Sequence, residues 1–215
     1  MFKKLFGKKD ELSSITAPEI MGLRLGGAFE LDDLKLRLIE PDLIIEGAAR
    51  THLIQAVGEV KLDATTTVLR FYTDDDAFLQ VLLDGGMTEN HIADVKLWYF
   101  YDTTGVGSQN EWDTLLKTGI SSGTRDLEGY TFERVWNTTG SDSQPVAMTD
   151  KTTAEDGSTA ETDQFAMLYE RQIKDDFFEY MMVVGEEKII DNRADRCRVI
   201  STGFDINAAD ISIIG

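Results

Sequence analysis

Residues 165–184, FAMLYERQIKDDFFEYMMVV, carry the clearest structural signal in this 215-residue sequence. Two runs rich in apolar and aromatic side chains, 165–173 and 177–184, flank the short polar link Lys174-Asp175-Asp176. β-Strands favour such residues, and a link of this length suits a tight turn between antiparallel neighbours. The stretch therefore predicts a β-hairpin.

The same period-two alternation recurs along most of the chain, and the links are too short for helical crossovers. Residues 77–83 form either a return strand after the turn Asp74-Asp75-Asp76 or a helix capped by Asp74. We favour the hairpin because β-favouring residues precede the turn. Further strands are predicted at about 34–38, 50–62, 67–72, 95–101 in a central position, 130–136, 198–206 and 211–214.

One helix is predicted over 110–118, because Ser108 and Glu111 match a capping box and Trp112 begins an amphipathic face. Residues 137–163 are poor in large apolar side chains, which predicts a solvent-exposed hairpin or an irregular excursion. The predicted fold class is mainly β, with a β-rich α+β fold as the alternative. We expect antiparallel sheets or a partly closed barrel or roll with one or two short helices.

The charge is distributed unevenly along the chain. The sequence holds 21 Lys and Arg against 39 Asp and Glu, a formal charge of -18. Residues 1–9, MFKKLFGKK, carry +4, so the other 206 residues carry -22. An acidic body argues against nucleic-acid binding, which needs clustered cations. We expect residues 1–14 to be a basic amphipathic segment and 15–215 to be a single β-rich domain that could divide near 105–125.

The basic start is the candidate contact surface. Apolar side chains share one side of a helical turn and a half while lysines flank it, as in an interfacial membrane anchor. A disordered solubilising tail is the alternative. The residues predicted to contact an anionic membrane or a partner protein are Phe2, Lys3, Lys4, Leu5, Phe6, Lys8 and Lys9.

Catalytic motifs are scarce in the sequence. Cys197 lies inside a predicted strand and is expected to be buried and inert, and His52 and His91 are the two histidines. Gly105-Val106-Gly107 is a weak phosphate-loop signal, and a flexible strand-to-helix turn explains it better. We expect no cofactor and no metal site. Paired carboxylates are expected in solvated turns: Asp74–Asp76, Glu111/Asp113, Asp175/Asp176, Glu186/Glu187 and Asp191/Asp195.

A single Cys permits no disulfide framework, and no apolar stretch follows the first lysines as an export signal requires. We therefore expect a cytoplasmic protein. The basic start adds the expectation that it associates peripherally with the inner face of the cytoplasmic membrane.

Five stretches of the sequence form a recognisable set, namely Arg70–Asp76, Leu79-Gln80-Val81, Val95–Phe100, Tyr169-Glu170-Arg171 and Phe178-Glu179-Tyr180. They resemble the uncharacterised bacterial YjfK-like family. The resemblance covers nearly the whole chain and implies a bacterial cytoplasmic protein of unassigned activity. Its relatives tend to be encoded beside phage-shock-type coiled-coil proteins and small membrane proteins, which implies such partners and a link to envelope stress.

Three functional hypotheses follow. The first is a non-catalytic accessory or adaptor protein at a membrane, led by its basic start. The second is a small-molecule-binding β-barrel with a pocket behind Trp98 or Trp136. The third is a hydrolase or metal enzyme that uses two carboxylates brought together from separate strands.

Overall fold

The computed structural model describes residues 17–136 and 143–214. The basic start, residues 1–9, and its predicted contact residues lie outside the described part. All strand pairs are antiparallel, which confirms the predicted mainly β, antiparallel fold class. The strands are β1 (Ala28–Leu31), β2 (Thr51–Lys61), β3 (Thr66–Thr73), β4 (Ala77–Asp84), β5 (Ile92–Gly105), β6 (Thr124–Leu127), β7 (Tyr130–Arg134), β8 (Val146–Ala154), β9 (Thr159–Lys174), β10 (Phe177–Ile190), β11 (Arg193–Asp205) and β12 (Ile211–Ile214).

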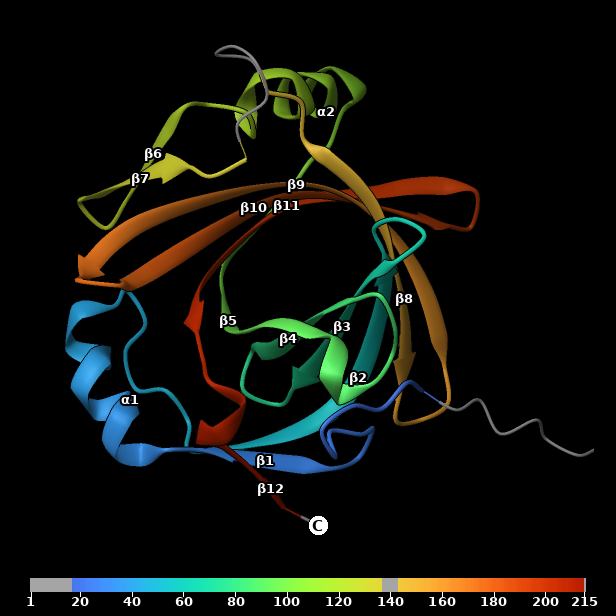
Figure 1. Cartoon of the computed structure of the whole chain (residues 1–215). Coiled ribbons are helices and arrows are strands. Elements are labelled where there is room, and N and C mark those ends of the chain that lie inside the picture. The colour runs from blue at the N-terminus through green and yellow to red at the C-terminus, as the bar shows by residue number, and fades with distance from the viewer. Residues whose placement is uncertain (1–16, 137–142, 215) are drawn as a thin grey trace, which may run out of the picture.

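Eight of these strands follow one another in a ring (Figure 1). The sheet runs β2-β3-β4-β5-β11-β10-β9, and β8 pairs with both β9 and β2. Because β8 joins the first strand of this series to the last, the sheet closes on itself. The expected antiparallel, barrel-like sheet is therefore confirmed, and β5 pairs on both sides, with β4 and β11, as predicted for a central strand.

The remaining elements cover the outside of the ring. β1 pairs with one end of β2 and with β12, and β7 pairs with β9 and carries β6. In Figure 1, α2, β6 and β7 lie over the β9–β10–β11 side of the ring, while β1 lies along the opposite side. The helical elements are α1 (Asp33–Ile39), α2 (Gln109–Thr114), the π-helical turn η3 (Leu115–Gly119) and the 3-10 turns η1 (Glu40–Asp42), η2 (Glu89–His91) and η4 (Ala208–Asp210).

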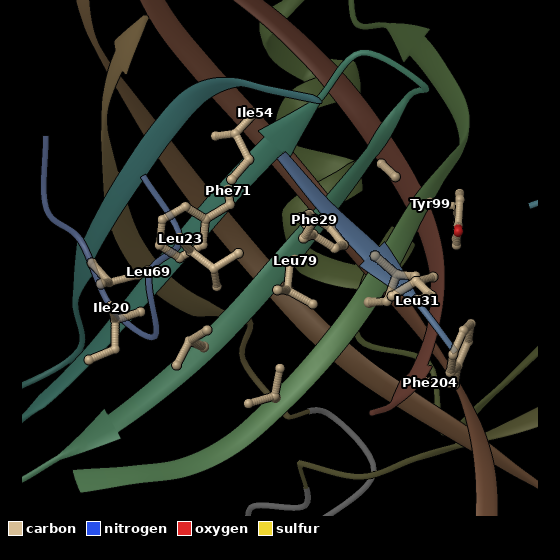
Figure 2. Close-up of a cluster of buried hydrophobic side chains, with 14 of the residues drawn as sticks. Ile20, Leu23, Phe29, Leu31, Ile54, Leu69, Phe71, Leu79, Tyr99 and Phe204 are labelled. Atoms are coloured by element: carbon tan, nitrogen blue, oxygen red, sulfur yellow. The ribbon is translucent and has the colours of Figure 1, made fainter. Parts of the chain in front are cut away.

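Buried clusters lie on both faces of the ring, since side chains alternate between inside and outside along each strand. The largest outer cluster packs Phe29 and Leu31 of β1 against Leu69, Phe71 and Leu79 of the ring (Figure 2). A second outer cluster lies over β9 and β10 and includes Met167, Tyr169, Met181 and Val183. A third cluster, described below, fills part of the inside.

Most of the predicted elements are present. β9 and β10 form the hairpin expected at 165–184, and β3 and β4 form the hairpin favoured at Asp74–Asp76. Asp76 has a φ of 57° in that turn, a left-handed conformation that Asp tolerates. The helix capped by Asp74 is therefore wrong. The capping box of Ser108 and Glu111 starts α2 as predicted, and the helix ends in the π-helical turn η3.

The strand predicted at 34–38 is wrong, because these residues form α1. Asp32 caps the helix by accepting hydrogen bonds from the backbone N–H groups of Leu34 and Lys35. The alternating leucines do not share a buried face. Leu36 is buried, whereas Leu34 and Leu38 are 69% and 63% exposed.

The hairpin predicted within 137–163 is present, but the solvent exposure predicted for it is wrong at the middle of β8. A turn at Asp156-Gly157 joins β8 to β9, and β8 completes the ring instead of projecting from it. Asp150 in the middle of β8 is 1% exposed. The polar composition of β8 fits a strand that faces the polar interior of the ring. Composition alone does not distinguish such a strand from one that faces solvent.

Among the described residues, none of the helices has the length and apolar character that crossing a membrane requires.

Candidate functional site

The inside of the ring combines an apolar cluster with a buried polar network. Residues next to one another on a strand divide between inside and outside: Leu97 belongs to the outer cluster, whereas Trp98 belongs to the inner one. The same division separates Val183 from Val184. The inner cluster consists of Phe78, Trp98, Ala166, Met182, Val184 and Val199, which come from five ring strands.

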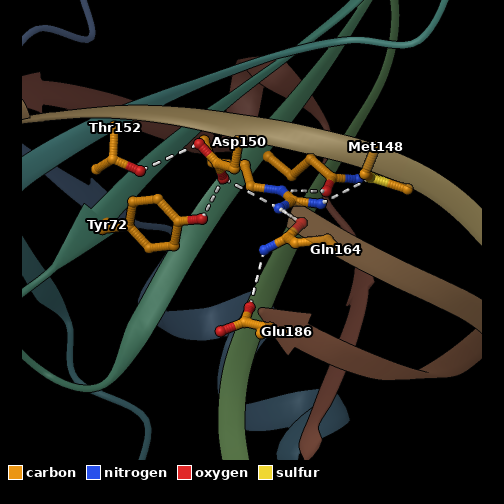
Figure 3. A network of polar contacts seen from close by, with 8 residues as sticks. Tyr72, Met148, Asp150, Thr152, Gln164 and Glu186 are labelled. Carbon is orange, nitrogen blue, oxygen red and sulfur yellow. Dashed lines mark hydrogen bonds and ion pairs between the residues drawn. The ribbon is translucent and has the colours of Figure 1, made fainter. Parts of the chain in front are cut away.

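Arg70 of β3 is the centre of the polar network. Figure 3 labels other members of this network, namely Tyr72, Asp150, Gln164 and Glu186. Arg70 is 3% exposed, and its Nη1 donates hydrogen bonds to Asp150 Oδ2 at 3.1 Å and to Gln164 Oε1 at 2.7 Å. Its Nε donates to Gln80 Oε1 at 3.2 Å. Burial alone would lower the pKa of Arg70, but Tyr72 and Asp150 outweigh it and raise the pKa above its ordinary value. The guanidinium therefore stays charged and ties β3 to β4, β8 and β9.

Both carboxylate oxygens of Asp150 in β8 accept hydrogen bonds. Its Oδ2 also accepts a hydrogen bond from the Tyr72 hydroxyl at 2.6 Å, and its Oδ1 accepts one from Thr152 at 3.1 Å. Burial raises the pKa of Tyr72, so the phenol keeps the proton that it donates. A Cβ on Gly58 of β2 would collide with the Asp150 carboxylate. The absence of a side chain at Gly58 makes room for this carboxylate where β8 meets β2.

Two cavities lie along the inside of the ring. Along β3, one is lined by Val68 and Arg70 and the other by Arg70 and Tyr72. Along β10, Tyr180 lines the first of these cavities, Glu186 lines the second, and Met182 lies between them and lines both. Arg70 and Met182 therefore form a layer that separates the two spaces.

The larger space, which we call the tryptophan cavity, has a volume of about 570 Å³. Trp98 of β5 and Trp136, which follows β7, both line it, together with aliphatic side chains such as Leu82 and Leu168. The buried indole Nε1 of Trp98 has no hydrogen-bond acceptor within the described residues. The charged or polar residues that line the tryptophan cavity are Thr66, Arg70, Gln80, Asp94, Lys96, Glu170 and Tyr180.

The smaller space, which we call the carboxylate cavity, has a volume of about 270 Å³ and is lined by Asp150 and Glu186. Gln164 Nε2 donates to Glu186 Oε1 at 2.8 Å, which joins Glu186 to the Arg70 network. Burial raises the pKa of Glu186, and the charge of Asp150 adds to the rise. Asp150 has both oxygens occupied by donors, so two free carboxylates do not meet here. This arrangement favours a structural network over a hydrolytic pair.

The sequence candidates lie mostly elsewhere. Cys197 is partly buried, and burial together with Glu186 raises the pKa of its thiol to about 11, so it stays protonated at neutral pH. Gly105 ends β5 and Val106-Gly107 leads into the capped helix α2, which matches the expected turn. His91 lies in the turn before β5, where its Nδ1 is 2.8 Å from the hydroxyl of Thr88.

His52 is completely buried outside the ring and stacks on Phe29, with ring centroids 4.7 Å apart. Its Nδ1 lies 2.9 Å from an oxygen of Asp75. Burial alone would raise the pKa of Asp75, but hydrogen bonds from His52 and Thr73 lower it below its ordinary value. The turn Asp74–Asp76 is thus not merely solvated, since Asp75 holds a buried histidine. Neither His52 nor Asp75 lines the tryptophan cavity or the carboxylate cavity.

The described residues contain no group of three or more His, Cys, Asp or Glu side chains placed to hold a metal ion. Of the aromatic run in β5, Trp98 lines the tryptophan cavity and Phe100 the carboxylate cavity. Tyr99 is buried in the outer cluster, and Tyr101 is exposed.

A family model described as "Protein of unknown function (DUF2491)" matches residues 1–212. The chain belongs to the DUF2491 family. A relative from Escherichia coli (strain K12), "Uncharacterized protein YjfK", is 29% identical over 217 residues, which cover 100% of this chain and 98% of the relative. The resemblance to YjfK-like proteins is therefore confirmed. No solved structure matches this DUF2491 chain.

Sequence reasoning missed the polar network of this DUF2491 protein. Arg70 stands between Leu69 and Phe71 in a strand whose neighbours on both faces are apolar, which is an unusual place for a charge. Gly58 inside a predicted strand was a second signal, because such a glycine often marks a close approach. Neither signal identifies Asp150 as the partner of Arg70, because the two residues are 80 positions apart in the chain.

Proposed function

We propose that this DUF2491 protein binds one small, largely apolar molecule inside its strand ring. The tryptophan cavity carries the proposal. Its volume of about 570 Å³ falls within the range of about 300–1,000 Å³ that is usual for small-molecule sites. A ring of eight strands leaves room inside for filling side chains or for one small ligand.

The cavity has the composition of a ligand site. Its walls include Trp98, Trp136, Leu82 and Leu168, which offer apolar and aromatic surface. A buried donor without an acceptor costs on the order of 1–3 kcal/mol. A ligand with a carbonyl, ether or hydroxyl oxygen would satisfy the Trp98 Nε1–H and remove that cost.

The walls are also held in place before any ligand arrives. Backbone pairing closes the ring, and Arg70 links four of its strands from the inside. A pre-organised site loses less conformational entropy on binding than a mobile one. The fold thus supports a binding module better than a pair of catalytic carboxylates.

Titration of full-length protein with Nile red, a neutral apolar dye, tests the proposal. We expect saturable one-to-one binding with a blue-shifted emission. Leu168→Trp fills the cavity and should weaken binding at least about tenfold. Leu34→Trp makes the same change on the exposed face of α1 and should leave binding unchanged. The absence of saturable binding to the wild-type protein, or equal binding by both folded variants, would contradict the proposal.

A second proposal concerns the basic start, and the uneven charge of the sequence supports it. Residues 1–9 hold four lysines, whereas the other 206 residues carry a formal charge of -22. This segment is therefore the part of the chain that an anionic surface attracts. We propose that it contacts an anionic membrane or an acidic partner protein. The two proposals concern different parts of the sequence, because the described residues that line the tryptophan cavity lie between Leu62 and Met182.

A further inference from the structure

The charged side chains around the tryptophan cavity indicate which molecules it accepts. Arg70 and Lys96 supply two positive charges, and Asp94 and Glu170 supply two negative ones. The Arg70 guanidinium is paired with Asp150, which is itself 1% exposed. Its charge is therefore already neutralised behind the cavity wall.

Lys96 is neutralised as well. Its Nζ lies 2.6 Å from Asp94 Oδ2, contacts Asp205 and is placed 4.5 Å from the centroid of the Tyr180 ring. One lysine thus faces two carboxylates and an aromatic ring. It has no unpaired charge left with which to hold an anionic ligand.

Glu170 of β9 is different. It lines the cavity and is only partly exposed, yet it forms no hydrogen bond or ion pair with any described residue. Its carboxylate lies on the same inner face as Leu168, two residues earlier on the strand. An unpaired carboxylate at the edge of an apolar space is stabilised by a positive charge that enters that space.

The aromatic walls suit the same charge. Trp136 is partly buried and lines the cavity. Within the part of the chain that the structure describes, no Lys or Arg side chain and no aromatic side chain stacks on its indole. Tryptophan is the side chain that most strongly attracts a cation over its face. The net charge of -18 further raises the local concentration of positively charged small molecules.

We propose that the ligand of the tryptophan cavity is an organic cation, namely an amine or a quaternary ammonium group on an apolar body. Glu170 serves as its counter-ion and Trp136 provides the face over which the cationic group lies. The apolar body fills the space beside Leu168, and an oxygen on it accepts the Trp98 Nε1–H. This inference rests on the proposed binding function and specifies its ligand.

Three probes that share one naphthalene body test the charge. They are 2-naphthylmethanol, which is neutral, 2-naphthylmethyl-trimethylammonium, which is cationic, and 2-naphthylacetate, which is anionic. Isothermal titration of full-length protein should show the cation binding on the order of tenfold more tightly than the neutral probe, with the anion weakest.

Glu170→Gln should abolish the preference for the cation and leave the affinity for the neutral probe within about twofold. Glu46→Gln is the matched control, because Glu46 is exposed in the loop before β2 and does not line the cavity. It removes the same net charge and should preserve the preference. Thermal unfolding of both variants verifies that each is folded.

The outcomes separate the two proposals. Equal binding of all three probes, or an unchanged cation preference in folded Glu170→Gln, would overturn the charge assignment and leave the binding function standing. Tightest binding of the anion would also overturn the assignment. If no probe binds the wild-type protein, the binding function itself fails.

Discussion

Arg70 Nη1 and Asp150 Oδ2 lie 3.1 Å apart inside the strand ring, although the two residues are 80 positions apart in the chain. Arg70 belongs to β3 and Asp150 to β8, the strand that closes the ring. The pair therefore fixes the last strand of the ring to a wall formed much earlier in the sequence. Arg70 also forms part of the layer between the two cavities.

Removal of one partner of this pair should destabilise the protein strongly. Asp150→Ala leaves the Arg70 charge buried without its carboxylate, so we expect the free energy of unfolding to fall by about 3–5 kcal/mol. Lys151→Ala is the control on the same strand, because Lys151 pairs with Glu161 in solvent. It should cost less than about 1 kcal/mol. Urea unfolding followed by circular dichroism measures both, and similar losses would refute a special role for the buried pair.

Gly58 and Asp150 should show coupled energetics. A Cβ at position 58 would meet the Asp150 carboxylate, so Gly58→Ala should cost about 1–3 kcal/mol through overpacking. In the background of Asp150→Ala the clash disappears. The second substitution should then cost less than about 0.5 kcal/mol. Strict additivity of the two costs in urea unfolding would show that Gly58 does not make room for the carboxylate.

Glu186 should make stability depend on pH. Because burial raises its pKa, the folded protein keeps a proton that the unfolded chain releases above its ordinary pKa of 4.5. The stabilising contribution is complete below that unfolded pKa and is lost as the pH rises through the folded pKa. Glu186→Gln stays neutral and should be more stable than wild type at about pH 7. Its free energy of unfolding should fall less than that of wild type between about pH 5 and pH 8.

Urea unfolding across that pH window measures the difference, with the exposed substitution Glu133→Gln as the reference. Parallel pH profiles for the wild-type protein and Glu186→Gln would argue against a buried, proton-holding Glu186.

The basic start should bind anionic vesicles. Full-length protein should co-sediment with vesicles that contain phosphatidylglycerol, and a variant that begins after Lys9 should not, because each lysine near an anionic surface contributes about 1 kcal/mol. Neutral phosphatidylcholine vesicles are the control and should bind neither form. Equal partitioning of both forms onto anionic vesicles would remove the membrane proposal.

The fold class could be predicted from the sequence because the two strands and the turn of a hairpin lie next to one another in the chain. Each pair of strands joined by a short turn, such as β9 and β10, shows its alternation and its turn residues side by side. Leu34, Leu36 and Leu38 misled because the same alternation occurs in α1, where the hydrogen bonds accepted by Asp32 set the conformation. One local cap outweighed a five-residue pattern.

The candidate site was only partly accessible. Trp98 and Trp136 were expected near a pocket, and both line the tryptophan cavity. The partnership of Arg70 with Asp150 depends on the closure of the ring, which joins segments far apart in the sequence. Residue types alone do not reveal that closure, because a polar strand that faces a buried network has the same composition as one that faces solvent.

The three indole N–H signals of the protein show whether the ring interior binds a small molecule. Trp98 and Trp136 line the tryptophan cavity, whereas Trp112 lies on α2 outside the ring, where it packs against Phe165. In ¹H–¹⁵N correlation spectra of the full chain titrated with 2-naphthylmethanol, the indole signals of Trp98 and Trp136 should shift and saturate together while that of Trp112 stays in place. No shift at Trp98 and Trp136, or an equal shift at Trp112, would contradict binding inside the ring.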